Sequence, residues 1–143
     1  MTDKIHFIFT GGTIDGIFNP SQYKPVPSKK SNIPSYLVDY VKFKSFTSSQ
    51  ISAIDGLEMT DNIRDEIITD ILNSSADKIV ITHGTDNMVN TARYINNYFK
   101  NGVNKTIIFV GAMHPLSFLP SDGGFNLGFA IANLSILKSG IYI

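Results

Sequence analysis

The sequence predicts an α/β domain in which a mostly parallel sheet carries helices on both faces, a Rossmann-like arrangement of three layers. Residues 5–9, 79–81 and 106–110 are apolar on nearly every successive position, as in strands that are covered on both faces. From residue 60 onward such runs alternate with segments of helical spacing, which indicates βαβ units. A length of 143 residues fits one domain with a core of its own.

The N-terminal part of the chain is predicted to hold one clear strand and a long loop. The strand covers residues 5–10. Residues 17–34 contain four prolines and several polar residues, a composition typical of a loop. Because long loops without structure of their own tend to be functional lids or disordered, residues 14–34 are expected to form a lid. A short helix or turn over residues 35–41 and a strand over residues 41–46 are expected next.

The first long helix is predicted to begin after Thr60. A threonine is a favoured N-cap, and Asp61 lies in the first turn, where the helix dipole favours a negative charge. Five apolar side chains then recur at the spacing of one helix face, and the helix is expected to end near residues 73–75. These side chains are Ile63, Ile67, Ile68, Ile71 and Leu72.

The remaining chain is predicted to repeat the alternation of strand and helix. Strands are expected over residues 78–82 and 106–110, with a helix between them that has Gly102 at its C′ position. Residues 111–124 are expected to form a loop and residues 125–137 a helix. The apolar stripes of the two helices are Met88, Ala92, Ile95 and Phe99 in the first, and Leu127, Ala130, Ile131 and Leu134 in the second.

Residues 1–143 are expected to form a single domain whose C-terminal end is truncated. Residues 141–143 look like the opening of a strand. An α/β domain rarely stops as a strand begins, because the loop after that strand normally contributes to the site.

Composition excludes several classes of function. Twelve basic and twelve acidic residues balance, and no basic block stands out, which argues against a nucleic-acid partner. No apolar run approaches the ~20 residues that span a bilayer, and residues 1–4 lack the character of a secretory signal. No cysteine is present, and the three histidines lack the spacing of metal ligands. A cytoplasmic protein without a membrane or metal partner is expected.

Two polar segments follow predicted strands, Thr10–Ile14 and His83–Asp86. Parallel strands place such segments at one edge of the sheet, where ligands bind in α/β folds. Gly11 and Gly12 allow a sharp turn, so that the Thr13 hydroxyl is exposed beside backbone N–H groups able to stabilise an oxyanion. The alternatives are a plain strand-to-turn junction and a phosphate-binding loop. The segment is neither G-x-G-x-x-G nor a Walker loop, and no Lys or Arg lies near Thr13 in the sequence, so the second alternative is disfavoured.

The segment His83–Asp86 allows two interpretations. Thr85 or Asp86 is either a simple N-cap of the following helix or part of a site. In a site, the dipole keeps the Asp86 carboxylate ionised, so that it binds an ammonium group or holds a base, while Thr85 passes a proton or positions water. His83 is expected to be a strand-end residue satisfied by the backbone. Tyr23, in the lid, either closes over Thr13 or covers apolar surface.

These segments resemble the two signature segments of the bacterial-type L-asparaginase family. Residues 111–115, Gly-Ala-Met-His-Pro, together with Ser-Asp-Gly-Gly-Phe-Asn-Leu at residues 121–127, resemble a third segment of that family. The resemblance covers essentially the whole chain but only the family's N-terminal domain, and stand-alone proteins similar to this domain exist. It implies an amidohydrolase that releases ammonia from a side-chain amide such as that of asparagine.

The resemblance also implies roles for particular residues. Thr13 matches the nucleophile that forms an acyl-enzyme, and Tyr23 matches the lid tyrosine that assists it. Thr85 and Asp86 match a second threonine and the aspartate that binds the substrate's α-amino group. No metal or organic cofactor is implied, and a homodimer or homotetramer is expected. The implied substrate-binding residues are Gly12, Gly56, Leu57, Gly84 and Ala112.

Three departures from the family pattern bear on activity. The lysine that works with the Thr–Asp pair lies beyond the strand that begins at Ile141, past the last residue of this sequence. Gly56 and Leu57 stand where a serine, often followed by glutamine or serine, binds the α-carboxylate, which costs about 1.5–3 kcal/mol of binding. His114 stands where arginine is usual. A catalytically impaired amino-acid-binding or regulatory domain is therefore the alternative function, and a nucleotide-binding domain is disfavoured.

Overall fold

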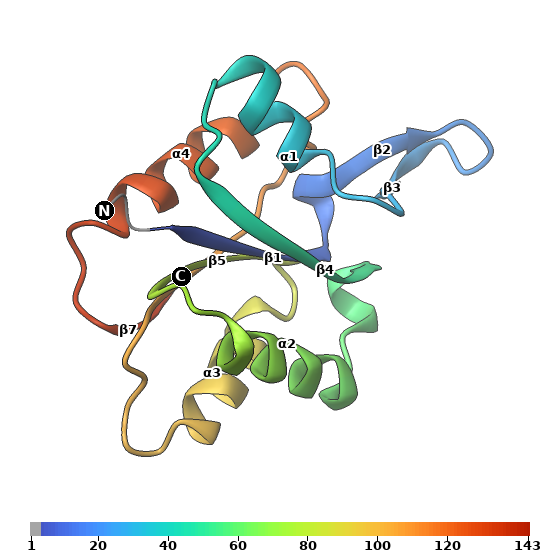
Figure 1. The fold of residues 1–143 in the computed structure, drawn as a ribbon. Helices are drawn as coiled ribbons and strands as arrows, with labels where there is room; N and C mark the ends of the chain where they lie inside the picture. Colours follow the sequence, from blue (N-terminus) through green and yellow to red (C-terminus); the bar gives the residue numbers. More distant parts are fainter. Residues whose placement is uncertain (1–3) are drawn as a thin grey trace.

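Residues 4–143 are described by a computed structural model whose centre is a five-stranded parallel sheet (Figure 1). The strand order is β4-β1-β5-β6-β7, and every neighbouring pair is parallel, as predicted. Three strand predictions are confirmed, because β1, β5 and β6 lie where the apolar runs place them. The bounds are β1 Ile5–Gly11, β4 Phe46–Ile54, β5 Lys78–Thr82, β6 Thr106–Val110 and β7 Gly140–Tyr142.

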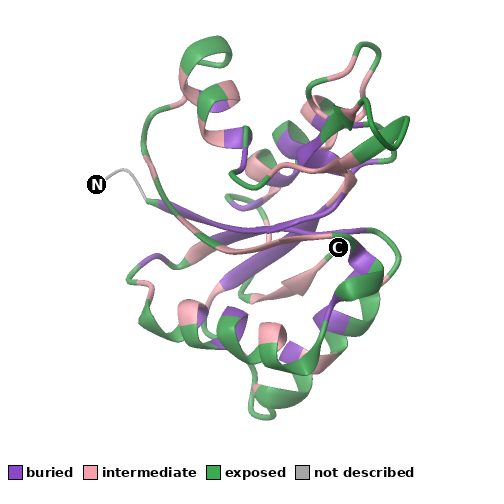
Figure 2. Cartoon of the chain, turned by 90° about the vertical axis from the view of Figure 1, so that its right-hand side faces the viewer, coloured by how far each residue is buried: buried purple, intermediate pink, exposed green. Residues whose placement is uncertain are grey.

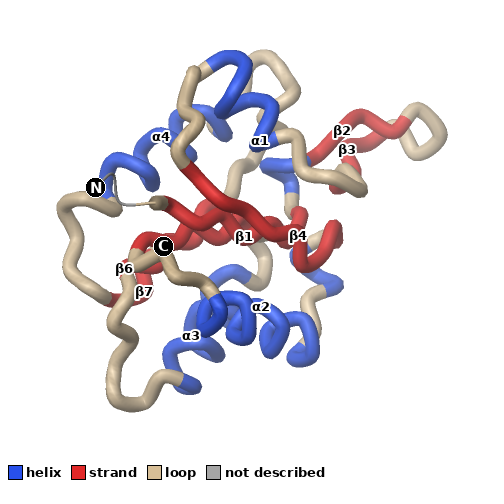
Figure 3. Tube along the Cα trace, in the orientation of Figure 1, coloured by secondary structure: helices blue, strands red, loops and turns tan. Residues whose placement is uncertain are grey.

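Helices cover both faces of this sheet, which confirms the three-layer prediction (Figures 1 and 3). Helices α2 (Asp61–Asn73) and α3 (Met88–Tyr98) lie on one face. Helix α4 (Gly123–Asn133) lies on the other, beside the short α1 (Ile33–Ser35) and a π-helical turn, Tyr36–Tyr40.

Strand β1 supplies both halves of the core. Phe7 and Phe9 pack toward α4, whereas Ile8 packs toward α2 and α3. All seven residues of β1 are buried, so both faces of this strand are covered. Figure 2 shows the same pattern: buried residues concentrate in the central strands, and the helices are buried on their inner sides only.

The predicted lid is more regular than expected. Residues 17–34 were predicted as a loop, but they include β2 (Gly16–Asn19) and β3 (Lys24–Pro27), which pair as an antiparallel hairpin. The hairpin was not predicted because Pro25 and Pro27 lie in β3, and proline is unfavourable in most strands. They are tolerated because a two-stranded ribbon leaves one backbone edge of each strand unpaired. Figure 1 shows the hairpin projecting from the body of the domain.

The strand expected over residues 41–46 is wrong. Lys42 has a left-handed backbone (φ 62°), and the Phe43 N–H donates to the Leu37 carbonyl, so this segment closes the preceding turn. The true edge strand, β4, begins at Phe46 and carries Ser and Thr at four of its nine positions. Because β4 lies at the edge of the sheet and is only partly buried, its sequence lacks the continuous apolar run of a central strand.

Smaller differences concern the ends and faces of the helices. Helix α2 is capped by the Thr60 side chain, as predicted, but Leu72 is 55% exposed and does not belong to the buried stripe. Helix α3 ends at Tyr98 with Phe99 as C-cap, so Gly102 (φ 87°) lies beyond the C′ position. Helix α4 begins two residues before and ends four residues before the predicted bounds of 125–137.

Candidate active site

Three glycines bring the loops after β1, β4 and β5 into direct contact. A Cβ atom added to Gly12 would lie 2.5 Å from the Gly84 nitrogen, and one added to Gly84 would lie 2.5 Å from the Gly56 Cα. No larger side chain fits at these two positions unless the backbone moves. The glycines therefore serve close approach of the backbone, and Thr13 and Thr85, which follow two of them, are carried to the same edge of the sheet.

Hydrogen bonds reinforce this meeting point. The Gly12 N–H donates to the Ile54 carbonyl at the end of β4 (2.8 Å). The Asn87 side-chain amide donates to the Gly56 carbonyl (2.8 Å), which ties the start of α3 to the loop after β4. The predicted convergence of these strand ends on one region is thus built from backbone contacts.

Thr13 opens a short 3₁₀ turn, Thr13–Asp15, directly after Gly12 (φ 76°). Its backbone carbonyl accepts from the Gly16 N–H. The side chain is half-buried, and its hydroxyl makes no hydrogen bond to another group within residues 4–143. The hydroxyl is therefore accessible to a ligand, and within residues 4–143 no base is bonded to it.

Thr85 and Asp86 lie in the turn between β5 and α3, and both are exposed. The residue at the N-cap of α3 is Asn87, and no side chain caps this helix end. The simple capping interpretation of Thr85 and Asp86 is therefore wrong, and both polar side chains are available to a ligand.

His83 connects this turn to the helices below the sheet. Its side chain is completely buried: Nε2 lies 2.9 Å from the Thr91 hydroxyl, and Nδ1 lies 2.7 Å from the Gly84 carbonyl. The Gly84 carbonyl can only accept, so Nδ1 carries the proton of the neutral ring, and Nε2 accepts from the Thr91 hydroxyl, whose oxygen accepts in turn from Arg64 Nε (3.1 Å). His83 therefore carries its proton on Nδ1 and donates it to Gly84.

The neutral state of His83 agrees with its surroundings. Burial lowers the pKa of His83, and the nearby Arg64 charge adds to the effect, against an opposing hydrogen bond from the ring to Gly84. The bond to the Gly84 carbonyl fixes the plane of the peptide that joins Gly84 to Thr85. The N–H of Thr85, on the opposite side of this peptide from the Gly84 carbonyl, therefore points away from His83. The sequence placed His83 at a strand end with a backbone partner, which is correct, but gave no sign of Thr91 or Arg64.

The third predicted segment forms a loop tied to the start of α4. The Asp122 carboxylate accepts from the backbone N–H groups of Met113 (2.9 Å) and His114 (2.8 Å). Ala112 is 3% exposed, and its side chain packs in the core. Only the backbone of this predicted substrate-binding residue can face the site. His114 is exposed, with Nδ1 3.5 Å from Asp122.

Tyr23 is not brought into contact with Thr13. It lies in the turn of the hairpin with φ 51° and is 86% exposed. Leu57 is also exposed (74%), although the Asp55 and Glu58 side chains form a capping box around its turn.

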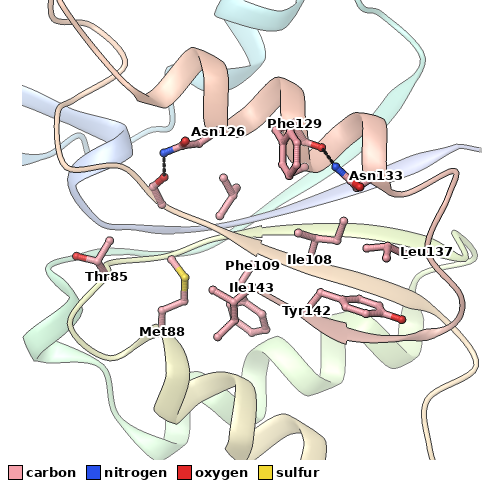
Figure 4. A pocket seen from close by; sticks show the side chains of 13 residues that line it. Thr85, Met88, Ile108, Phe109, Asn126, Phe129, Asn133, Leu137, Tyr142 and Ile143 are labelled. Carbon is pink, nitrogen blue, oxygen red and sulfur yellow. Dashed lines mark hydrogen bonds between the residues drawn. The ribbon is translucent and has the colours of Figure 1, made fainter.

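A pocket of about 390 Å³ lies beside this region, between α4 and the ends of β6 and β7 (Figure 4). Thr85 and Gly111 stand at its margin, and its other lining residues are mostly apolar. Thr13, Tyr23 and Asp86 do not line it. β7 pairs with β6 only as far as Tyr142, so the two last residues of β6 border this pocket without a neighbouring strand on that side. The pocket is therefore adjacent to the candidate site and distinct from it.

Within residues 4–143, no group of three or more His, Asp or Glu side chains is placed to hold a metal ion. No helix in the same range is long and apolar enough to cross a membrane.

Comparison with known proteins decides the family. Residues 4–140 match the family profile described as Asparaginase, N-terminal. The chain belongs to the asparaginase family. It is 32% identical to L-asparaginase 2 of Escherichia coli over 130 residues, which is 87% of this chain and 36% of the relative. It is 30% identical to the probable periplasmic L-asparaginase of Haemophilus influenzae, over 95% of this chain and 40% of the relative.

Solved asparaginase structures share the fold. The probable cytoplasmic L-asparaginase of Campylobacter jejuni is 28% identical, with a TM-score of 0.75 over 98% of this chain and 43% of its own. The thermostable L-asparaginase of Thermococcus kodakarensis is 20% identical, with a TM-score of 0.79 over 96% of this chain and 43% of its own. The chain thus spans less than half the length of these relatives.

Proposed function

We propose that this chain acts as an asparaginase-like amidohydrolase with Thr13 as the nucleophile. The observation that carries the proposal is the contact of Gly12, Gly56 and Gly84, which sets Thr13 and Thr85 on loops that touch. Membership of the asparaginase family and the unpartnered Thr13 hydroxyl support it further.

The proposed reaction has two steps. Thr13 Oγ1 attacks the amide carbon of the substrate, and backbone N–H groups stabilise the oxyanion that forms. The C–N bond breaks as the departing amide nitrogen takes up the proton released by the hydroxyl and leaves as ammonia, and an acyl ester remains on Thr13. Water then hydrolyses this ester to a carboxylate and frees the hydroxyl. In this scheme, Thr85 relays the proton or positions the water.

Substrate recognition divides between two loops. The Asp86 carboxylate, exposed in the turn before α3, is proposed to bind the α-ammonium group of the substrate. Tyr23 contributes only when the hairpin closes, because in the present conformation it lies in solvent. With Gly56 in place of a serine, no hydroxyl at this position binds the α-carboxylate, so amides without that group should lose little affinity.

Ammonia release tests the proposal. We expect turnover of asparagine and of 3-aminopropanamide, which is asparagine without its α-carboxylate, and no turnover by Thr13→Ala. Thr13→Ser, which keeps the hydroxyl, serves as the matched control and should retain activity. If Thr13→Ala matches the wild-type protein, or if the wild-type protein hydrolyses no amide, the proposal is wrong.

The second candidate function is amino-acid binding without catalysis, favoured by the replacement of the serine anchor by Gly56 and Leu57. A rise in melting temperature with aspartate, without hydrolysis of any amide, would support it. Gly56→Ser tests the anchor itself. Its Cβ would lie 3.1 Å from Gly84, a tight fit, so we expect tighter binding of asparagine together with lower stability.

We further propose a homodimer or homotetramer and a cytoplasmic location. Phe125 and Phe129 of α4 support self-association, because they stack (centroids 6.1 Å apart) with 76% and 64% of their surfaces exposed, Phe129 at the margin of the pocket. Light scattering of the purified protein tests the assembly, and fractionation of cells tests the location.

A further inference from the structure

Asp15 is a buried carboxyl group two residues after Thr13, at the point where the hairpin leaves the body of the domain. Only 2% of its surface is exposed. Its N–H donates to the Gly12 carbonyl (3.2 Å), which closes the 3₁₀ turn that begins with Thr13. The next residue, Gly16, starts β2 and pairs with Pro27. Asp15 therefore belongs both to the turn of Thr13 and to the base of the hairpin.

The same residue also holds the strand that returns from the hairpin. Its backbone carbonyl accepts from the Ser28 N–H (2.9 Å), one residue past β3. Its Oδ1 atom accepts from the Asn32 N–H (2.8 Å), four residues further along. One residue thus fixes both ends of the segment that carries Tyr23.

The surroundings of this carboxyl are poor for a charge. Within residues 4–143, its second oxygen, Oδ2, is buried without a hydrogen-bond partner. Burial raises the pKa of Asp15, while hydrogen bonds from the Ser31 hydroxyl and the Asn32 N–H act in the opposite direction. No charged neighbour contributes to this balance. Burial of a carboxyl group with one unbonded oxygen costs solvation free energy. Because packing of the core does not require a carboxyl group at this position, we look for its role in the bonds that it makes.

We propose that Asp15 is a positioning residue that couples the hairpin to Thr13. When the hairpin moves, its base pivots on the bonds from Ser28 and Asn32, and Asp15 transmits this movement to the turn that holds the nucleophile. The consequence for catalysis rests on the proposed amidohydrolase function. The coupling itself does not depend on that function, because it involves only hydrogen bonds within the chain.

Amide hydrogen exchange of the wild-type protein and of Asp15→Ala tests the coupling. Loss of the carboxylate should accelerate exchange of the Asn32 amide about ten- to a hundredfold, the range expected for a hydrogen bond to a charged group. The Ser28 amide bonds to a backbone oxygen that the substitution retains. It should nevertheless exchange faster, because the whole base of the hairpin loosens.

Two further variants serve as controls. Asp15→Asn keeps the oxygen that accepts from Asn32 and should exchange like the wild-type protein. Asn19→Ala removes the acceptor of the Ser21 N–H at the tip of the hairpin and should leave the Ser28 and Asn32 amides unchanged. If Asp15→Ala does not fold, Asp15→Ser, which keeps a polar side chain but lacks the Oδ1 atom that accepts from Asn32, should still accelerate exchange of the Asn32 and Ser28 amides.

Kinetics separate this proposal from the proposed function. Asp15→Ala should lower kcat about tenfold or more with little change in KM, and Asp15→Asn should restore kcat. Unchanged exchange at both amides in Asp15→Ala and Asp15→Ser overturns the coupling, whatever the activity. Acceleration of Asn32 alone, with normal kcat, also overturns it, since the bond is then merely local. A wild-type protein without amidase activity overturns the proposed function and leaves the exchange result standing.

Discussion

At the scale of single residues, the site depends on positions that carry little chemistry of their own. Gly12, Gly56 and Gly84 contribute no functional group, yet their contacts place the loops of Thr13 and Thr85 together. His83 acts in a similar way, since it fixes the orientation of the Gly84 peptide without being exposed to a ligand. The reactive side chains and the residues that position them are thus largely different sets.

Replacement of two buried threonines by valine should change the free energy of unfolding in opposite directions. Thr82 is completely buried, and its hydroxyl has no partner within residues 4–143, so Thr82→Val should raise the free energy of unfolding by about 1 kcal/mol. Thr91 is equally buried, but its hydroxyl bonds both Arg64 and His83. Thr91→Val should lower the free energy of unfolding by about 1–3 kcal/mol.

Urea unfolding of the two valine variants measures these changes, and an unchanged m-value would show that both variants remain two-state. The pair is well matched, because each substitution replaces the same hydroxyl by a methyl group at a site without solvent. Equal effects of the same sign would contradict the hydrogen-bond assignment.

The sequence predicted part of this residue-level picture. The spacing of strand ends and glycines indicated Thr13, Thr85 and Asp86, because each follows an apolar run. It gave no sign of the link from His83 to Arg64. This link runs through Thr91 of α3 and joins the residue after β5 to α2, elements that only the folded chain brings together. The burial of Asp15 was missed because a short carboxylate after a glycine turn is typical of an exposed residue.

At the scale of elements, the central strands could be predicted and the edges could not. Strands β1, β5 and β6 are covered on both faces, so their sequences are continuous apolar runs. Strand β4 has a free edge, and its Thr47 and Ser49 side chains contact His6, a polar partner. Its sequence therefore lacks the apolar run, and its position depends on pairing with β1.

The loop before α4 offers a test at the same scale. Asp122→Ala removes the acceptor for the Met113 and His114 N–H groups and should lower the free energy of unfolding by about 1 kcal/mol, a modest value because the carboxylate is partly exposed. Asp122→Asn, which keeps one oxygen, should cost less. Thermal unfolding of the two variants gives the comparison, and an alanine variant as stable as the wild-type protein would contradict it.

The pH adds a second prediction for this loop. The hydrogen bond from the Met113 N–H, with that from His114, lowers the pKa of Asp122 below its ordinary value of 3.8. The folded state therefore binds fewer protons than the unfolded state just below this pH. The contribution of Asp122 to stability is complete above pH 3.8 and is lost as the pH falls toward the folded-state pKa.

At the scale of the whole molecule, stability should depend on pH through His83. Burial lowers its pKa from 6.5, so between the two pKa values the unfolded state binds the proton and the folded state does not. The contribution of His83 to the free energy of unfolding should be constant above pH 6.5 and should fall as the pH drops below that value. Urea unfolding between pH 8 and pH 5 should show a decline that His83→Gln reduces, and an equal decline in both proteins would contradict it.

Asp15 acts on the whole molecule in the opposite direction. Because burial raises its pKa above 3.8, the folded state holds this proton more tightly than the unfolded state. Stability is therefore lost as the pH rises from 3.8 through the folded-state pKa. Asp15→Asn should be more stable than the wild-type protein at neutral pH, and a less stable variant would mean that the charge is compensated.

The central claim is that Thr13 forms a covalent ester with the substrate. Rapid acid quenching during turnover of asparagine, followed by mass spectrometry of the peptides, tests it most directly. We predict that the peptide containing Thr13 gains the mass of the substrate less ammonia, and that Thr13→Ala shows neither this adduct nor turnover. An adduct on a different residue, or turnover by Thr13→Ala, would contradict the account.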